Sequence, residues 1–448
     1  TTMVTGRHTG FKILGAAAED ATGYSVSSAG DVNGDGVDDI VVGAITASPP
    51  GLAPNSKAGI VYVIFGYKVT SNADAFTDLD LATLATSSTT LFRVFGAVGG
   101  DKLGFSVSAA DINGDSYTDV VIGARAASPD AGRIRSGITY VIWGYDQIGT
   151  DLDLSLLNSA VGFRILGAVD EDAFGSSVSG AGDVNGDGIG DILMYCVKED
   201  ATHGVVVYGS TDAGTAAIDI ADLYSASLLG YSITAGSAFP LFHLKPAGDI
   251  NGDGKDDLLV GQADAVAHGR DQAGIVCVMY GQNDTASREP VLLSDFVNGP
   301  TTGMRFIGFA NAYLGFPNLG YSGNYAGPAM MASAGDFNND GKPDIMFATT
   351  ITDDDTYERA GSHQVYVLSA ELSAPPQPLY YDVDIDTLEE GPTFHKVLGA
   401  FNLGLRACSI GDFNDDGLDD LFVAAVVNGL SGATGGYVLF NTGAAPTE

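Results

Sequence analysis

The distribution of hydrophobic residues predicts short strands along the whole chain. The first stretch has an apolar segment at 10–16, a mixed segment with a glycine–aromatic pair at 23–30, and continuous apolar runs at 40–44 and 59–66. Short runs separated by glycine-rich turns are typical of β-structure. The runs at 40–42 and 60–65 do not alternate with polar residues, which predicts strands buried on both faces.

This unit recurs from one end of the chain to the other. Its most regular part is a nine-residue acidic loop that precedes the first continuous apolar run. We number these loops 1 to 6, and they occupy residues 31–39, 111–119, 183–191, 249–257, 336–344 and 412–420. The repeats fill residues 1–448, which predicts a single repeat domain.

Each unit is predicted to form four short antiparallel strands, so the fold class is all-β. Four-stranded sheets that are buried on both faces and repeat at a near-constant period are typical of β-propeller blades. Six loops predict six blades, and seven remain open because the spacing between loops 4 and 5 is long enough for a degenerate blade. An open solenoid is the alternative, which would need polar caps at its ends.

The two ends of the chain predict how the ring closes. Residues 11–16 match residues 92–97 and 163–168, which follow the last strand of a unit and are expected to form the outer strand of the preceding blade. The last unit ends at 436–440 without such a strand. We therefore expect the N-terminal strand to complete the last blade.

The acidic loops predict calcium sites. In the pattern Asp-x-Asn-x-Asp-Gly-x-x-Asp, side-chain oxygens stand at positions 1, 3, 5 and 9, and position 7 can offer its carbonyl. Calcium takes six to eight oxygen ligands, magnesium demands stricter octahedral geometry, and zinc and copper prefer nitrogen and sulfur. Glycine at position 6 permits the left-handed turn that such a loop needs.

We expect about six Ca²⁺ ions, one per loop, with a structural and not a catalytic role. The predicted ligands are Asp31, Asn33, Asp35, Val37, Asp39, Asp111, Asn113, Asp115, Tyr117, Asp119, Asp183, Asn185, Asp187, Ile189, Asp191, Asp249, Asn251, Asp253, Lys255, Asp257, Asp336, Asn338, Asp340, Lys342, Asp344, Asp412, Asn414, Asp416, Leu418 and Asp420.

The loop pattern is less typical of two other structures. A set of Asx-turns needs no metal, but six copies that keep every oxygen-bearing position argue against it. An EF-hand needs a glutamate at position 12 and helical flanks, whereas position 12 of loop 1 is Val42, in a predicted strand. Ser116 replaces the usual glycine in loop 2, which predicts a strained turn or weaker affinity. Asn339 stands where most loops have glycine.

Composition narrows the partners. The formal charge of −36 excludes nucleic acid and anionic lipid as favourable partners and favours cations. Cys196 and Cys277 stand in apolar runs, which predicts buried thiols, and with Cys408 they make an odd number that cannot all pair. No apolar stretch approaches the roughly 20 residues that span a bilayer, so no direct membrane insertion is expected.

The unit resembles the FG-GAP repeat of integrin α-chain propellers. The FG part appears as Gly23-Tyr24, Gly104-Phe105 and Phe174-Gly175, and the GAP part as Gly43-Ala44 and Gly123-Ala124, without the usual proline; Gly261-Gln262 and Ala424-Ala425 are degenerate copies. The resemblance implies ligand binding on the face opposite the calcium loops, through the segments 45–57, 125–136, 264–273 and 349–360.

The expected function is that of a secreted or cell-surface adhesion or ligand-binding module, with an extracellular protein or glycan as ligand. Extracellular sites bind calcium at about 10⁻⁴–10⁻³ M, so cytosolic calcium would leave them empty. The alternatives are a carbohydrate-binding lectin and, further off, a polysaccharide-active hydrolase or lyase; no catalytic residue is predicted.

One aromatic insertion is a candidate ligand surface. Tyr313, Phe316, Tyr321 and Tyr325 stand among glycines and asparagines, a composition that suits stacking on sugar rings or packing against a protein. The same rings could instead plug the propeller channel. The charge run 353–355 could bind a further cation, but a solvated surface run is the favoured interpretation.

Overall fold

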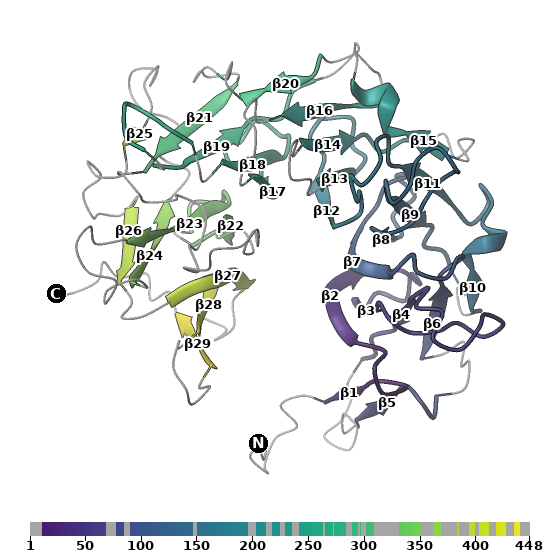
Figure 1. Ribbon diagram of the computed structural model, residues 1–448. Coiled ribbons are helices and arrows are strands. Elements are labelled where there is room, and N and C mark those ends of the chain that lie inside the picture. The colour runs from purple at the N-terminus through teal and green to yellow at the C-terminus, as the bar shows by residue number, and fades with distance from the viewer. Residues whose placement is uncertain are drawn as a thin grey trace, which may run out of the picture. The chain divides into compact units, whose positions relative to one another are not determined.

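The chain is folded into β-sheets and divides into two compact units (Figure 1). The first unit comprises residues 1–180, 189–198 and 205–231, and the second comprises 181–188, 199–204 and 232–448. The computed structural model describes residues 11–68, 78–84, 90–146, 150–195, 203–211, 217–224, 229–234, 242–262, 265–271, 273–283, 289–293, 296, 302–308, 331–337, 339–351, 362–368, 383–384, 394–398, 403–411, 418–426 and 434–439.

The described residues form six sheets of three to five strands and one two-stranded sheet. In spatial order, the first sheet consists of β10 (Leu152–Asp153), β6 (Leu91–Phe95), β4 (Ile60–Ile64), β3 (Asp39–Ala44) and β2 (Thr22–Gly30). The second sheet consists of β15 (Ala217–Asp219), β11 (Gly162–Leu166), β9 (Ile138–Ile142), β8 (Asp119–Ala124) and β7 (Leu103–Ala110). The third sheet consists of β12 (Ser177–Gly182), β13 (Asp191–Tyr195), β14 (His203–Val207), β16 (Gly230–Thr234) and β20 (Val291–Leu292).

The remaining sheets follow the same order of strands. The fourth is β17 (Phe242–Gly248), β18 (Asp257–Gln262), β19 (Ile275–Met279), β21 (Gly303–Ile307), β25 (Val383–Asp384); the fifth is β22 (Met331–Gly335), β23 (Asp344–Ile351), β24 (Ser362–Leu368), β26 (Phe394–Leu398); the sixth is β27 (Leu403–Gly411), β28 (Asp420–Val426), β29 (Thr434–Leu439). The two-stranded sheet is β1 (Ile13–Leu14) with β5 (Leu79–Asp80), and the helical turns are η1 (Leu154–Leu156) and η2 (Ile220–Tyr224).

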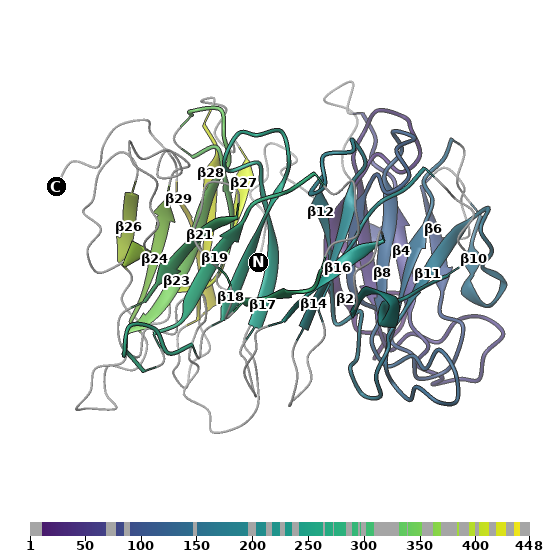
Figure 2. The ribbon, with the colours of Figure 1, turned by 90° about the horizontal axis from the view of Figure 1, so that it is seen from above.

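The continuous apolar strands are buried on both faces, as predicted. All five residues of β4 and all five of β9 are buried. In the first unit, one hydrophobic cluster joins the first and second sheets through Val41, Val63, Phe92, Val120 and Ile122. In the second unit, Leu259, Phe306 and Phe347 belong to a cluster that joins the fourth and fifth sheets. Neighbouring sheets within a unit therefore pack face to face, and Figure 2 shows their strands side by side.

Adjacent sheets approach closely at glycines that recur from one repeat unit to the next. A Cβ atom on Gly43 would overlap the carbonyl oxygen of Gly104 in the next sheet, and a Cβ on Gly123 would overlap that of Gly175. The same carbonyls accept hydrogen bonds from serine hydroxyls of the preceding sheet, Ser25 Oγ at 2.7 Å from Gly104 O and Ser106 Oγ at 2.9 Å from Gly175 O. Only glycine fits where two backbones meet in this way.

The outer strands pair as the sequence predicts, with one addition. Strand β6 pairs antiparallel with β4, and β11 pairs with β9, so residues 91–95 and 162–166 do complete the preceding sheet. Each then accepts a short parallel fifth strand, β10 or β15, which the four-stranded prediction missed. The signal was present as repeated Leu-Asp-Leu or Ile-Asp-Ile tripeptides at 79–81, 152–154 and 218–220.

The first strand has the pairing of an outer strand. β1 pairs in parallel with β5, as β6 pairs with β10 and β11 with β15. The sixth sheet has three strands within the described residues, and the predicted pairing of the N-terminal strand with it is not among the described sheets.

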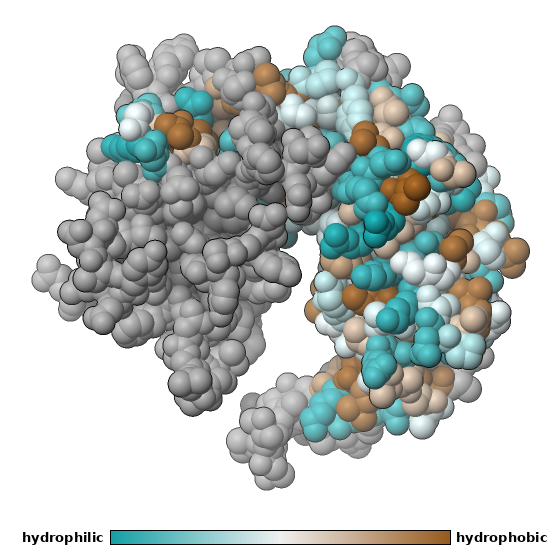
Figure 3. All heavy atoms as spheres, viewed as in Figure 1, coloured by the Kyte–Doolittle hydropathy of each residue, from teal (hydrophilic) through white to brown (hydrophobic). Residues whose placement is uncertain are grey.

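The surface is polar with scattered apolar residues. On the face of the first unit shown in Figure 3, hydrophobic residues lie singly or in small groups among hydrophilic ones. Within the described part of the chain, no helix is long and apolar enough to cross a membrane. Cys277 is buried in β19 as predicted, whereas Cys196 lies outside the described residues.

Candidate functional site

Each acidic loop joins the first and second strands of a sheet. Loops 1 to 5 connect β2 to β3, β7 to β8, β12 to β13, β17 to β18 and β22 to β23, and loop 6 connects β27 to β28. The aspartate at position 9 is in every case the first residue of the second strand. Strands on both sides exclude an EF-hand, which needs flanking helices. Residues 412–417 of loop 6, with predicted ligands Asp412, Asn414 and Asp416, and Asn338 of loop 5 lie outside the described residues.

The carboxylate at position 1 organises the turn. In loop 1, Asp31 accepts hydrogen bonds from the backbone N–H groups of Asp35 and Gly36, at 3.0 and 2.7 Å. Loops 2 to 5 repeat this pair of bonds, at 3.2 and 2.9 Å in loop 2, 3.0 and 2.8 Å in loops 3 and 4, and 2.9 and 2.9 Å in loop 5. Five loops of different sequence therefore adopt one conformation.

Positions 3 and 5 extend the same pattern. Asn33 Oδ1 accepts the N–H of Asp35 at 2.9 Å, and Asp35 Oδ1 accepts the N–H of Val37 at 2.9 Å. Asn33 Nδ2 also donates to Asp35 Oδ2 at 3.2 Å. Equivalent bonds recur in loops 2 and 4. The side-chain oxygens of positions 1, 3 and 5 are thus gathered around one turn.

Two left-handed residues give loops 1 to 5 their curvature. Position 6 has φ between 72° and 87° in loops 1 to 5, and the residue there is glycine except for Ser116, which adopts φ 72° in loop 2. This confirms the strained turn predicted at Ser116. Position 4 is also left-handed, including Asn339 with φ 59°. Asparagine tolerates this region better than most residues, which accounts for its presence there.

Position 9, also a predicted ligand, has a role within the sheet itself. Asp39, Asp119, Asp191, Asp257, Asp344 and Asp420 are all buried. In loop 2, Asp119 Oδ2 accepts the N–H of Ile112 at 2.8 Å and Oδ1 accepts the N–H of Gly144 at 2.9 Å. Loops 1 and 4 repeat both bonds, with Gly66 and Gly281 as the distant donors. The position 9 carboxylate is therefore an anchor, because its hydrogen bonds connect the loop to the segment that follows the third strand.

Burial governs the protonation of these anchors. Desolvation raises the pKa of Asp39 to about 6, while backbone N–H bonds from Gly66 and Val32 oppose the rise. The same cause raises the pKa of Asp119 and of Asp257 to about 7. A cation beside such a carboxylate favours its ionised form.

The donor set of the loops fits a hard cation. Positions 1, 3 and 5 supply carboxylate and amide oxygens, and the described loop residues include no histidine or cysteine. The lysines at position 7 are already paired, Lys255 with the Asp253 carboxylate at 3.0 Å and Lys342 with the carbonyl of Asn251 at 3.2 Å. Oxygen-only sets suit calcium and magnesium. The described residues contain no group of three or more His, Cys, Asp or Glu side chains arranged so that they could hold a metal ion.

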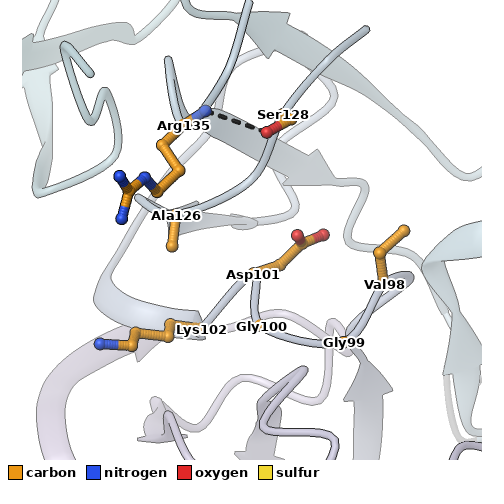
Figure 4. A pocket seen from close by; sticks show the side chains of 8 residues that line it. All are labelled: Val98, Gly99, Gly100, Asp101, Lys102, Ala126, Ser128 and Arg135. Atoms are coloured by element: carbon orange, nitrogen blue, oxygen red, sulfur yellow. Dashed lines mark hydrogen bonds between the residues drawn. The ribbon is translucent and has the colours of Figure 1, made fainter. Parts of the chain in front are cut away.

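A pocket lies at the opposite end of the second sheet from loop 2. Its lining comes from the segment that enters β7 and the segment that leaves β8, and its volume is about 420 Å³. The lining residues are Val98, Gly99, Gly100, Asp101, Lys102, Ala126, Ser128 and Arg135. In Figure 4 the Asp101 carboxylate points between the two segments, whereas Lys102 and Arg135 extend away from it.

Asp101 is the chemically distinctive group of this pocket. Its residue is 8% exposed, and burial raises the pKa of its carboxyl to about 6. The Arg135 guanidinium pairs with the Glu171 carboxylate at 2.7 Å, and the backbone N–H of Arg135 donates to Ser128 Oγ at 2.9 Å. A buried carboxylate in a pocket of this size is able to bind a polar ligand. Asp101 is not among the site residues predicted from the sequence, although an aspartate stands at the same place in Asp20-Ala-Thr-Gly and Asp172-Ala-Phe-Gly.

The repeat can now be compared with known families. A family model for the FG-GAP repeat matches residues 22–64, 103–135 and 246–279. The chain carries FG-GAP repeats. The matched ranges contain β2 to β4, β7 and β8, and β18 and β19, together with loops 1, 2 and 4.

Curated proteins with similar sequences include enzymes and integrins. The chain is 32% identical over 203 residues to phosphatidylinositol-glycan-specific phospholipase D of Bos taurus, 28% over 253 residues to integrin alpha-V of Gallus gallus, and 31% over 214 residues to integrin alpha pat-2 of Caenorhabditis elegans. These matches cover 42%, 55% and 45% of this chain, but only 22%, 20% and 16% of the relatives. The chain therefore spans about a fifth of the length of the relatives it matches.

The structure gives the FG-GAP motif a physical meaning in this chain. Gly43 and Gly123 of the GAP part lie against Gly104 and Gly175 of the FG part in the following repeat. The FG glycines have φ near +80°, which an L side chain rarely adopts. The motif is thus a contact between neighbouring repeats. The aromatic candidates Tyr313, Phe316, Tyr321 and Tyr325 and the charge run 353–355 lie outside the described residues.

Proposed function

We propose that this chain is an extracellular ligand-binding module whose acidic loops hold calcium in a structural role. The observation that carries the calcium assignment is the shared hydrogen-bonded conformation of loops 1 to 5, at the same place in each sheet. Such a turn brings carboxylate and amide oxygens together in one loop, and calcium accepts six to eight oxygen ligands in a flexible coordination shell. Integrin and phospholipase relatives support an FG-GAP module of this kind.

The proposed architecture is a closed propeller of six blades. Each of the six sheets contains one acidic loop between its first two strands. Strand β1 pairs with a short parallel strand, as the outer strands of the first two sheets do. The sixth sheet supplies β27 to β29, to which β1 would add the outer strand. The whole of 1–448 is then a single domain.

Localisation follows from the affinity expected of such loops. Calcium sites of extracellular modules have dissociation constants of about 10⁻⁴–10⁻³ M, so they fill at millimolar calcium. We therefore place the protein in the secreted or cell-surface compartment. The ligand is an extracellular protein or a glycan, and a glycan ligand would make the module a lectin.

Counting bound calcium tests the metal assignment. Equilibrium dialysis followed by elemental analysis at millimolar calcium should give about six ions per chain. Asp115→Ala, which removes a carboxylate of loop 2 but no anchor, should lose about one ion. Asp130→Ala removes an exposed carboxylate of the same unit, paired with Arg133, and should lose none. A wild-type protein that retains no calcium would sink the proposal.

The pocket at Asp101 is the proposed ligand site in the first unit. A glycan array and a panel of extracellular proteins would identify the ligand, and Asp101→Asn should then weaken its binding about tenfold, because a buried charged acceptor is lost. Asp20→Asn changes the equivalent aspartate of the preceding repeat and serves as the matched control. Equal affinity of Asp101→Asn and the parent would place the ligand elsewhere.

An enzyme is the second candidate, and one observation favours it. The relative with 32% identity is named as a phosphatidylinositol-glycan-specific phospholipase D. Incubation of this chain with a protein anchored by phosphatidylinositol-glycan would detect such an activity as release of the protein. Our proposal of a non-catalytic module expects no release above a buffer control.

A further inference from the structure

Neighbouring acidic loops are hydrogen-bonded to each other through their backbones. In the first unit, the N–H of Thr118 at position 8 of loop 2 donates to the carbonyl of Asp31 at position 1 of loop 1, at 3.1 Å, and the N–H of Gly190 in loop 3 donates to Asp111 O at 2.8 Å. In the second unit, Asp256 N donates to Asp183 O at 2.9 Å. Position 1, a predicted ligand, is therefore held by the next loop.

A second bond accompanies the first in each of these pairs. The N–H groups of Tyr145, Ser210 and Gln282 donate to the position 2 carbonyls of Val32, Ile112 and Val184, at 3.1, 2.9 and 3.0 Å. Each donor directly follows the glycine whose N–H binds the position 9 anchor of the later loop. The anchor of one loop thus fixes a contact with the loop before it.

Side chains at position 7 add a packing contact. Tyr117 lies over Gly34, Ile189 over Gly114 and Lys255 over Gly186, so closely that a Cβ on any of these glycines would contact the covering side chain. Position 7 is also the predicted source of a carbonyl ligand. The residue that would bind an ion in one loop therefore covers the turn of the preceding loop.

The link between loops 3 and 4 has an additional carboxylate. Asp256 Oδ2 accepts the N–H of Asp183 at 2.7 Å, while Asp256 N donates to the carbonyl of the same residue. Asp419 of loop 6 accepts the N–H of Asp336 in the same way, at 2.9 Å. Asp256 and Asp419 stand at position 8, which supplies no predicted ligand, so their carboxylates serve the contact between loops.

Loop 5 replaces this link with a different one. Its position 8 is Pro343, which has no N–H to donate. Lys342 at position 7 instead donates from Nζ to the carbonyl of Asn251 in loop 4, at 3.2 Å, and its side chain covers Gly252. A contact between loops 4 and 5 persists although the backbone bond is lost.

We propose that cation binding in neighbouring loops is coupled, such that an ion in the later loop raises the affinity of the loop before it. This inference rests on the proposed calcium function. An ion in loop 4 would fix Lys255 and Asp257, and the Asp256 between them holds Asp183. Part of the ordering that loop 3 needs for its own ion is then already in place, which is a positive coupling through reduced conformational freedom.

A double-mutant cycle on loops 3 and 4 tests the coupling. Hydrogen exchange of residues 183–188, followed by mass spectrometry during a calcium titration, gives the calcium concentration that half-protects loop 3. Asp253→Ala, which removes a loop 4 ligand, should raise that concentration by about threefold or more. In the Asp256→Ala background, adding Asp253→Ala should have little further effect, because the link is already cut. Asp271→Ala, at an exposed turn of the same unit, is the charge-matched control.

The outcomes separate the coupling from the calcium function. The coupling is supported if Asp253→Ala raises the calcium concentration that half-protects loop 3, and if this rise disappears in the Asp256→Ala background. Calcium-dependent protection of loop 3 that is identical in wild type and Asp253→Ala overturns the coupling and leaves the calcium function intact. Absence of calcium-dependent protection in wild-type loops overturns both. Exchange in the core strands β18 and β19 shows that each variant is folded.

Discussion

Gly123→Ala should lower the melting temperature by about 3 °C or more, which corresponds to about 3 kcal/mol or more of lost stability in a cooperative domain of this length. Gly123 lies in β8, where the added methyl group would overlap the backbone carbonyl of Gly175 and the hydroxyl oxygen of Ser106. A backbone carbonyl cannot rotate away as a side chain can. The second sheet would have to move from the segment that enters the third sheet, and the bond from Ser106 Oγ to Gly175 O would be lost with it.

The control for this prediction is a glycine without such a neighbour. Gly132 lies in an exposed turn, where a Cβ would meet only a carboxylate oxygen of Asp130 at 3.3 Å. Gly132→Ala should leave the melting temperature nearly unchanged or raise it slightly, because alanine reduces the freedom of the unfolded chain. Thermal unfolding of both variants in the same calcium buffer is the measurement. Equal melting temperatures for the two would show that the sheets do not depend on the glycine contact.

The sequence was sufficient for features that depend on neighbours in the chain. The apolar runs at 40–44 and 60–64 predicted buried strands, and the position of residues 91–95 after such a run predicted their pairing with β4. The conformation of loops 1 to 5 also follows from local chemistry, because the bonds of positions 1, 3 and 5 join residues at most five apart. Hydrogen bonds between such near neighbours can be predicted directly from a nine-residue pattern.

Features that depend on distant partners were not predictable in the same way. The pattern marked Asp119 as an oxygen donor, but one of its two bonds comes from Gly144, 25 residues away. A spacing pattern shows which atoms are available and not which other groups already use them. The same limit applies to Tyr117, whose carbonyl was singled out and whose ring covers Gly34 in the preceding loop. The burial of Asp101 likewise depends on the segment that leaves β8.

Removal of calcium should lower the melting temperature by about 3–9 °C. With dissociation constants of about 10⁻⁴–10⁻³ M, each filled loop contributes about 0.4–1.4 kcal/mol at millimolar calcium. Six loops together contribute several kcal/mol, which is comparable with the net stability of a domain. The measurement is thermal unfolding with calcium and with a calcium-selective chelator.

The high negative charge of the chain requires a salt control for that experiment. A chain with 56 acidic and 20 basic residues gains stability from any added salt, because counterions screen its self-repulsion. Sodium chloride at matched ionic strength measures this screening alone. If the loops bind calcium specifically, sodium chloride should restore little of the loss, magnesium only part of it, and calcium all of it. Unfolding that responds equally to all three salts would mean that the loops bind no specific ion.

The anchors at position 9 determine which part of the structure should persist after calcium is removed. Asp119 and Asp257 connect each loop to its own sheet by bonds to backbone N–H groups, and these bonds need no metal. The chelated protein should therefore keep its β-sheet circular dichroism at room temperature and lose protection first in the loops. Asp119→Ala should behave in the opposite way, because two buried N–H groups would lose their acceptor and destabilise the protein with or without calcium. Comparing chelation with Asp119→Ala thus separates the ion's contribution from that of the carboxylate that anchors its loop.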